Sequence, residues 1–104
     1  MRRGEVWWAE LNPPSGRRPV LLISRDTSYY KRSLAIVAPV TTRVRNITAE
    51  VPLTTLDGMP QKCVVNLDTL VTIAKSRLSH RVTVLTPEKL KKVDEALRFA
   101  LGLD

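Results

Sequence analysis

The chain has 104 residues, of which 43% are apolar and 26% are charged, a composition that fits one folded domain over residues 1–104 and excludes a disordered chain. Seventeen lysine and arginine residues against ten acidic residues give a net charge of +7, which favours a polyanionic partner such as nucleic acid. The sequence has no apolar run long enough to cross a bilayer, no apolar signal-peptide core and no cysteine besides Cys63, so we expect a cytoplasmic protein with no membrane partner and no internal disulfide.

Short apolar runs separated by turn residues predict a mainly-β domain. The first run, Glu5 to Leu11, is rich in strand-forming residues and ends at the turn sequence Asn12-Pro13-Pro14-Ser15-Gly16. The expected strands span residues 5–11, 19–24, 34–40, 47–53, 63–67, 70–73 and 81–85. Pro39 predicts a bulge or a strand end, and Pro52 predicts that its strand lies at an edge of the sheet.

The last 19 residues have a helical pattern instead. Thr86 is a good N-cap and Pro87 suits the first helical position, while Gly102 is a typical C-cap. Apolar residues recur at helical spacing between them, at Leu90, Val93, Leu97 and Leu101. Several short strands and one closing helix predict a small, strongly curved barrel of SH3-like kind with a C-terminal α-helix.

Several kinds of chemistry are excluded by the residues that the chain lacks. His80 is the only histidine, so one chain cannot supply the two imidazoles of a two-histidine ribonuclease. The ten acidic residues are scattered without metal-ligand spacing, and no glycine-rich phosphate loop is present. We therefore expect neither a metal nor any other cofactor.

The remaining candidate chemistry belongs to arginine and hydroxyl groups near strand ends. Arg17 and Arg18 precede the second strand, and the third strand is followed by Thr41, Thr42, Arg43 and Arg45. A guanidinium fork and a hydroxyl can bind the same phosphate, and RNA supplies its own nucleophile, the 2′-hydroxyl. These residues therefore suffice for RNA cleavage, although the same arginines are also consistent with a solvated basic rim.

Other residues allow two interpretations each. Trp7 and Trp8 are adjacent in a strand and point to opposite faces, so one is expected in the core and the other in a groove, at a subunit contact or in solvent. Asp26 either orients Arg18 or accepts a proton, or else it serves the turn before Thr27.

The order of these motifs resembles the MazF/PemK toxins. The resemblance begins with Arg3-Gly4-Glu5-Val6-Trp7 and Leu11-Asn12-Pro13, and continues through Arg18 to Asp26. It extends over Ala38-Pro39-Val40-Thr41-Thr42 and Val64-Val65-Asn66-Leu67-Asp68 to the closing helix, and so covers nearly the whole chain.

The resemblance implies a MazF/CcdB/Kid-like fold and a homodimer that cleaves single-stranded RNA without a metal. It also implies that a cognate antitoxin neutralises the toxin by binding it through an acidic peptide segment. The catalytic roles of the family fall on Arg18 and Thr41. Around this pair we expect the substrate to be bound by Arg17, Ser24, Asp26, Thr42, Arg43 and Arg45. The loop before Arg18 is shorter than is common in the family, so no recognition sequence is carried over.

Two other functions are compatible with such a fold. CcdB-type toxins share it but trap a topoisomerase without nuclease chemistry. A catalytically silent SH3-like module would bind nucleic acid or peptide and would need neither Arg18 nor Thr41.

Overall fold

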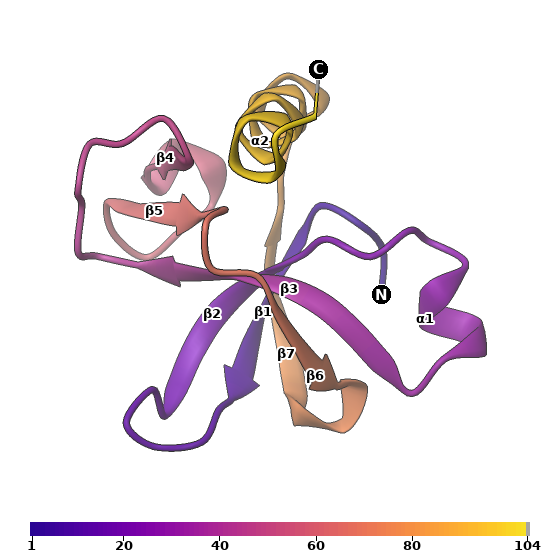
Figure 1. Cartoon of the computed structure of the whole chain (residues 1–104). Coiled ribbons are helices and arrows are strands. Elements are labelled where there is room, and N and C mark those ends of the chain that lie inside the picture. Colours follow the sequence, from indigo (N-terminus) through magenta and orange to yellow (C-terminus); the bar gives the residue numbers. More distant parts are fainter. Residues whose placement is uncertain (104) are drawn as a thin grey trace.

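The computed structural model describes residues 1–103, in which seven strands, two α-helices and two short 3-10 helices are formed (Figure 1). In chain order they are β1 (Glu5–Glu10), β2 (Arg17–Leu22), α1 (Ser28–Lys31), β3 (Leu34–Thr41), β4 (Glu50–Leu53), η1 (Thr55–Asp57), β5 (Cys63–Asn66), β6 (Val71–Ala74), η2 (Lys75–Arg77), β7 (Leu78–Val84) and α2 (Pro87–Leu101). The predicted strands and the predicted C-terminal helix are all present.

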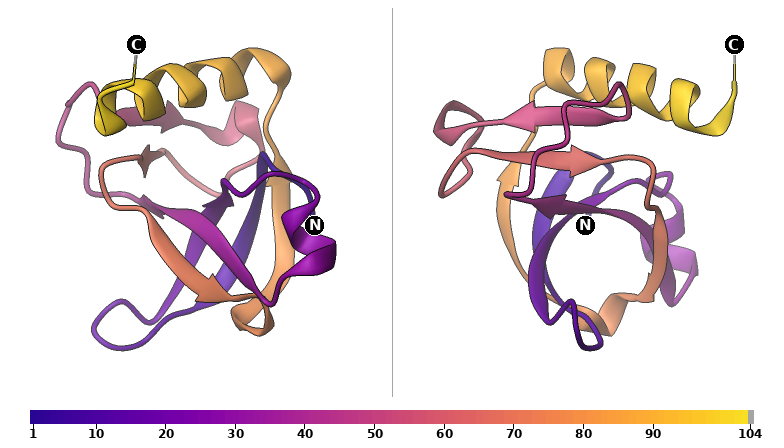
Figure 2. Two further views of the ribbon diagram at one scale, coloured as in Figure 1. Left: turned by 45° about the vertical axis from the view of Figure 1, so that its right-hand side comes forward. Right: turned by 60° about the vertical axis from the view of Figure 1, so that its left-hand side comes forward.

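The strands form one antiparallel sheet in the order β4-β5-β3-β2-β1-β7, and β6 pairs separately with β3. The predicted edge position of the strand that contains Pro52 is confirmed, because β4 pairs only with β5 in the described residues. Among these residues β6 and β7 do not pair, so the sheet is strongly curved but not closed. Figure 2 shows the strands wrapping around a central space, with α2 lying over β4 and β5.

Strand β3 is the longest and has different neighbours along its length. Its first half pairs with β6 as far as Val37, and its end pairs with β5 from Val40 onward. Pro39 lies between these two segments, where the missing N–H of proline breaks no ladder on that side. The prediction of a bulge or strand end at Pro39 is therefore wrong, since β3 continues to Thr41.

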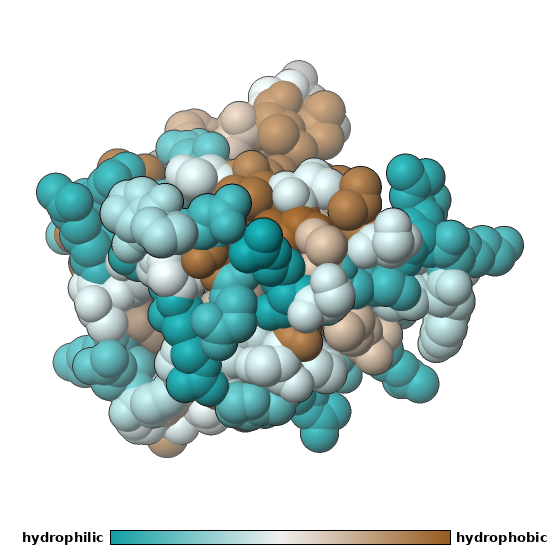
Figure 3. Space-filling view, turned by 90° about the horizontal axis from the view of Figure 1, so that it is seen from below, coloured by the Kyte–Doolittle hydropathy of each residue, from teal (hydrophilic) through white to brown (hydrophobic). Residues whose placement is uncertain are grey.

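Apolar side chains fill two separate layers. One layer lies between the sheet and α2 and includes Val6, Leu21, Leu53 and Leu97. The other lies on the opposite face, inside the curve of the sheet, and is formed by Ala9, Val20, Leu22, Tyr29, Ala35, Val37, Ile73 and Leu78. Seen from below, apolar side chains are visible near the middle and along the upper edge of the molecule, while hydrophilic ones dominate the sides and the lower part (Figure 3).

The caps of α2 are those that the sequence predicts. The Thr86 hydroxyl accepts a hydrogen bond from the Lys89 N–H at 3.2 Å, and Gly102 has a left-handed backbone with φ of 68°. Arg3 also forms an ion pair with Asp94 at 2.7 Å, which joins α2 to the N-terminal segment. Within residues 1–103, no helix combines the length and the apolar character needed to span a bilayer.

The main differences from prediction lie at element ends. Strand β2 begins at Arg17 rather than at residue 19, because Arg17 and Arg18 pair with Glu10 and Ala9 of β1. Strand β4 begins at Glu50, since the N–H of Glu50 closes a turn onto the Ile47 carbonyl at 3.0 Å. The short helix α1 is not apparent from the sequence, because four residues carry no helical periodicity.

Candidate active site

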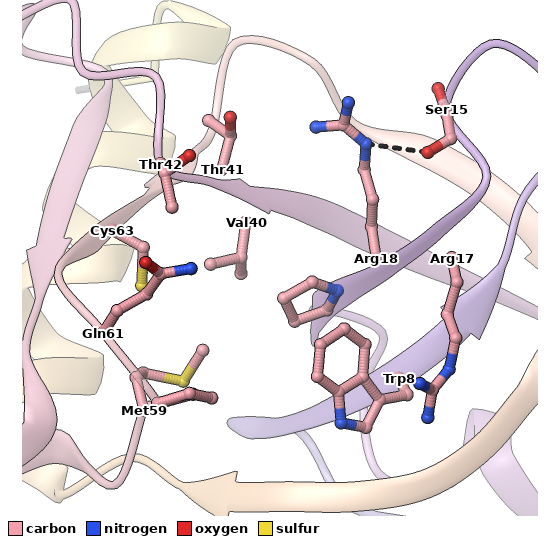
Figure 4. A pocket seen from close by; sticks show the side chains of 12 residues that line it. Trp8, Ser15, Arg17, Arg18, Val40, Thr41, Thr42, Met59, Gln61 and Cys63 are labelled. Atoms are coloured by element: carbon pink, nitrogen blue, oxygen red, sulfur yellow. Dashed lines mark hydrogen bonds between the residues drawn. The ribbon is translucent and has the colours of Figure 1, made fainter.

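Arg18 and Thr41 come together because β2 and β3 are antiparallel neighbours. Val20 lies opposite Pro39, so moving two residues outward along each strand places Arg18 opposite Thr41 and on the same face. Both side chains line two adjoining surface hollows. Figure 4 shows them at one of these hollows, reaching it from the two neighbouring strands.

The two side chains are oriented by local hydrogen bonds. Arg18 Nε donates to the Ser15 carbonyl at 2.9 Å, so the short loop before β2 fixes the guanidinium group (Figure 4). Its terminal amino groups have no hydrogen-bond or carboxylate partner within residues 1–103. Thr41 Oγ1 accepts the Arg43 N–H at 3.1 Å, which leaves the hydroxyl proton available to another acceptor. The pair thus offers several donors to one oxyanion.

The first hollow, which we call the apolar hollow, has a volume of about 320 Å³. Its apolar lining consists of Trp8, Pro19, Val40, Met59, Pro60 and Cys63, and its polar lining of Ser15, Arg17, Arg18, Thr41, Thr42 and Gln61. Figure 4 shows the Gln61 amide inside this space, with Trp8 on another wall. Burial, with a smaller contribution from the charge of Asp57, raises the pKa of the Cys63 thiol, so the thiol is neutral.

The two tryptophans face different surroundings, as predicted, but both are half-buried and neither lies fully in the core. Trp8 lines the apolar hollow, while Trp7 packs against the second core layer and donates from Nε1 to Glu5 Oε1 at 2.9 Å. The guanidinium carbon of Arg17 lies 4.5 Å from the centre of the Trp8 ring, and Arg17 Nε is 3.5 Å from Glu10 Oε1. Arg17 is therefore already engaged by neighbouring groups, unlike Arg18.

The second hollow, which we call the basic hollow, has a volume of about 500 Å³. Its lining residues are Leu11, Ser15, Arg18, Pro39, Thr41, Thr42, Arg43, Arg45, Glu50, Asn66, Thr69 and Val71. The guanidinium groups of Arg43 and Arg45 form no ion pair with a carboxylate within the described residues. Their positive charges are therefore available to a bound anion.

The structure brings six of the eight predicted site residues together, namely Arg17, Arg18, Thr41, Thr42, Arg43 and Arg45. Ser24 and Asp26 lie elsewhere. Ser24 is buried and its hydroxyl accepts the Ile36 N–H at 2.7 Å, while Asp26 accepts the Arg3 N–H at 2.7 Å. Six residues of extended chain span about 20 Å, so residues beyond the end of β2 cannot reach Arg18 at its start.

The lining residues that the sequence did not point to include Glu50, Gln61 and Asn66. They come from β4, β5 and the segment between these strands, and only the pairing of β3 with β5 carries them to the site. No set of three or more histidine, cysteine or acidic side chains within residues 1–103 is arranged to hold a metal ion.

Residues 2–101 match the family described as PemK-like, MazF-like toxin of type II toxin-antitoxin system. The chain belongs to this family. It is 35% identical over 103 residues to the probable endoribonuclease MazF2 of Mycobacterium tuberculosis, covering 98% of this chain and 99% of the relative. The match therefore extends over nearly the full length of both chains.

Solved structures of PemK/MazF-like proteins have the same fold. The Mycobacterium tuberculosis toxin MazF-mt6 superimposes with a TM-score of 0.88 at 31% identity, covering 96% of this chain and 98% of that one. An endoribonuclease from Mycobacterial species, solved in complex with its cognate antitoxin, has a TM-score of 0.88 at 27% identity over 100% and 97% of the two chains. The predicted family and the predicted fold are both confirmed.

Proposed function

We propose that this PemK/MazF-like chain is a toxin that cleaves single-stranded RNA by a metal-independent mechanism, with the scissile phosphate bound between Arg18 and Thr41. The observation that carries the proposal is the arrangement of this pair. Two side chains with unused donor groups meet at the common border of a hollow suited to a base and a hollow suited to the charged backbone. A relative of nearly equal length is named as a probable endoribonuclease, which supports this activity.

The reaction needs no nucleophile from the protein. The 2′-hydroxyl oxygen of the substrate forms a bond to the adjacent phosphorus and gives its proton to water. The bond from phosphorus to the 5′ oxygen breaks, and that oxygen takes up a proton. The products are a 2′,3′-cyclic phosphate and a 5′-hydroxyl.

The contribution of the protein is electrostatic and positional. The terminal amino groups of Arg18 and the hydroxyl of Thr41 stabilise the extra negative charge of the pentavalent phosphorane. Because an arginine side chain stays protonated at neutral pH, Arg18 acts as a fixed charge rather than as the acid. Holding the 2′-hydroxyl in line with the leaving oxygen supplies the remainder of the rate acceleration.

The same surface suits an acidic peptide. A chain with a net charge of +7 and unpaired arginines at its site attracts carboxylates as well as phosphates. We therefore propose that a cognate antitoxin inserts an acidic segment over Arg18 and the basic hollow. We also propose that the toxin acts in the cytoplasm, that each protomer is a single domain, and that two protomers form a homodimer. The solved complex of a similar Mycobacterial endoribonuclease with its cognate antitoxin supports an antitoxin partner.

The test is a cleavage assay in EDTA with a long single-stranded RNA, in which the ends of the fragments are mapped. We expect discrete cuts that leave cyclic phosphate and 5′-hydroxyl ends, and loss of these cuts in Arg18→Ala. Asp26→Asn is the matched control, because Asp26 lies away from the site, and it should cut at the same positions. If a folded wild-type protein leaves several unrelated RNAs intact, the silent binding module or the topoisomerase poison takes the place of the nuclease.

A further inference from the structure

The segment between β3 and β4, residues 42–49, carries three of the site residues and is held in an unusual way. We call this segment the basic loop, because it contains Arg43 and Arg45. Within the described residues, no backbone-to-backbone hydrogen bond involves residues 42–46. Their amides are held by side chains instead, that of Arg43 by Thr41 Oγ1, and those of Arg45 and Asn46 by Glu50 Oε1.

Of these two side chains, Glu50 holds two amides of the basic loop, whereas Thr41 holds one. A single oxygen, Oε1, accepts the Arg45 N–H and the Asn46 N–H, each at 3.0 Å. Asn46 has a φ of 58°, a left-handed conformation that asparagine adopts more readily than other non-glycine residues, and the hydrogen bond to Glu50 holds its amide in place there. The Glu50 carboxylate therefore determines the shape of the basic loop at the point where the chain reverses toward β4.

The position of Glu50 makes a direct role in phosphate binding unfavourable. It is the first residue of β4, it is only 9% exposed, and it pairs with Asn66 of β5 beside the basic hollow. Its second oxygen, Oε2, is buried without a hydrogen-bond partner in the described residues. A carboxylate repels phosphate, so any benefit of Glu50 to RNA binding must be indirect.

We propose that Glu50 is a positioning residue for the nuclease, which holds the basic loop in the conformation that presents Arg43 and Arg45 to the RNA backbone. This inference rests on the proposed function and specifies how its basic hollow is kept in a binding-competent shape. Fixing the loop before binding removes an ordering cost that the RNA would otherwise have to offset.

The consequence for kinetics differs from that of a catalytic residue. Arg18 is oriented by the Ser15 carbonyl, and Thr41 is held by its place at the end of β3 and by the Arg43 N–H, so neither side chain hydrogen-bonds to Glu50 itself. Removing the Glu50 carboxylate should therefore raise KM and weaken RNA binding while leaving kcat nearly intact. A residue needed only for folding would not divide the two constants in this way.

The test compares the full-length wild-type chain with Glu50→Ala and Glu50→Gln, each also combined with the double substitution Arg43→Ala/Arg45→Ala. The binding probe is a single-stranded RNA with a 2′-deoxy residue at the cleavage position, and the all-RNA version gives kcat and KM. Glu50→Ala should bind about tenfold more weakly and show a shallower salt dependence, because fewer phosphates are neutralised. Glu50→Gln keeps an acceptor oxygen and should restore most of the binding.

The combined variants decide whether Glu50 acts through the arginines. If it does, Glu50→Ala causes no further loss once Arg43 and Arg45 are alanine. The inference is overturned if the losses add, if Glu50→Gln loses as much as Glu50→Ala, or if both variants bind RNA more tightly, as simple removal of a repulsive charge would cause.

An independent measurement covers the case in which Glu50→Ala does not fold. In the wild-type protein, amide hydrogen exchange at Arg45 and Asn46 should be slower than at Val44, which has no hydrogen bond to Glu50. Equal and rapid exchange at all three amides would overturn the inference. A wild-type protein that fails to cut RNA overturns the proposed nuclease instead, and the exchange result remains a separate test of the loop.

Discussion

The two hollows beside Arg18 and Thr41 share a border but differ in their linings. The apolar hollow is built from Trp8, Met59 and their neighbours, with the Gln61 amide and hydroxyl groups as its neutral hydrogen-bonding groups, and its arginines are the shared Arg18 and the already engaged Arg17. The basic hollow contains the shared Arg18, two further arginines, an asparagine and a buried carboxylate. An unstacked base needs a flat apolar surface and a few polar atoms, whereas the sugar–phosphate backbone needs positive charge. The difference indicates a base subsite on one side of the scissile phosphate and a backbone subsite on the other.

The two hollows also differ in how firmly they are built. Val40, Met59 and Cys63 belong both to the apolar hollow and to the core layer beneath α2, so its wall is as fixed as the core. Most of the positive charge of the basic hollow comes from a loop that two side-chain anchors hold. Sequence preference is thus expected to depend on the rigid side, and overall affinity on the adjustable side.

Replacing Arg18, which borders both hollows, should have the largest effect. We expect Arg18→Ala to lower kcat by about 100- to 1,000-fold, because a preorganised donor to the phosphorane is lost. Binding of a 2′-deoxy RNA should weaken much less. Arg17→Ala is the comparison variant, and since Arg17 is already engaged by Trp8 and Glu10, its rate should fall only a few-fold. Equal losses in initial-rate assays would contradict the assignment.

Removing the Thr41 hydroxyl should have the next largest effect. Thr41→Val keeps the shape of the side chain but loses the donor to the phosphate and the acceptor for the Arg43 N–H. We expect kcat to fall by roughly 10- to 100-fold, within the usual effect of one transition-state hydrogen bond. Thr41→Ser should recover much of this loss. If Thr42→Val cleaves RNA more slowly than Thr41→Val, the hydroxyl that contacts the phosphate belongs to Thr42, and the assignment to Thr41 is wrong.

The apolar hollow is tested by Trp8→Ala. Loss of an aromatic surface that stacks on a base costs about 1–3 kcal/mol, so affinity should fall by roughly tenfold. The loss should depend on one base of the substrate, which a series of RNAs with single-base replacements will reveal in binding titrations. Trp8→Phe should behave nearly as the wild type. If Trp8→Ala weakens every RNA in the series equally, the apolar hollow does not select a base.

The smallest effects are expected in the basic hollow. Arg43→Ala and Arg45→Ala should each weaken binding by less than about tenfold and by the same factor for all sequences, since a phosphate contact carries no base information. Each change should reduce the slope of log affinity against log salt concentration by about one. A change in base preference with an unaltered salt slope would reverse the roles that we assign to the two hollows.

Much of the fold follows from local patterns in the sequence. The strands were predicted from apolar runs between turns, and α2 from its caps and its helical spacing, because these signals lie within a few residues of one another. The partner change at Pro39 could not be predicted, because it depends on how β5 and β6 share the length of β3. Pairing register is a long-range property that one sequence does not display.

The candidate site likewise depends partly on local motifs and partly on long-range strand pairing. The resemblance to the MazF/PemK toxins points to Arg18 and Thr41, and the register of β2 and β3 brings them together. Ser24 and Asp26 were misplaced because nearness along an extended strand is not nearness in space. Gln61 and Glu50 were missed because their importance depends on the pairing of β5 with β3 and on the hydrogen bonds of the basic loop.

The identity of the nucleophile can be tested with a single chemical change in the substrate. Two single-stranded RNAs of the same cleavable sequence are incubated with the wild-type protein in EDTA, one all-RNA and one with a single 2′-deoxy residue at the mapped cleavage position. We expect that both RNAs bind, that the first is cut to a 2′,3′-cyclic phosphate and a 5′-hydroxyl, and that the second stays intact. Cleavage of the 2′-deoxy substrate at the same bond would show that the attacking group is not the 2′-hydroxyl and would contradict the roles given to Arg18 and Thr41.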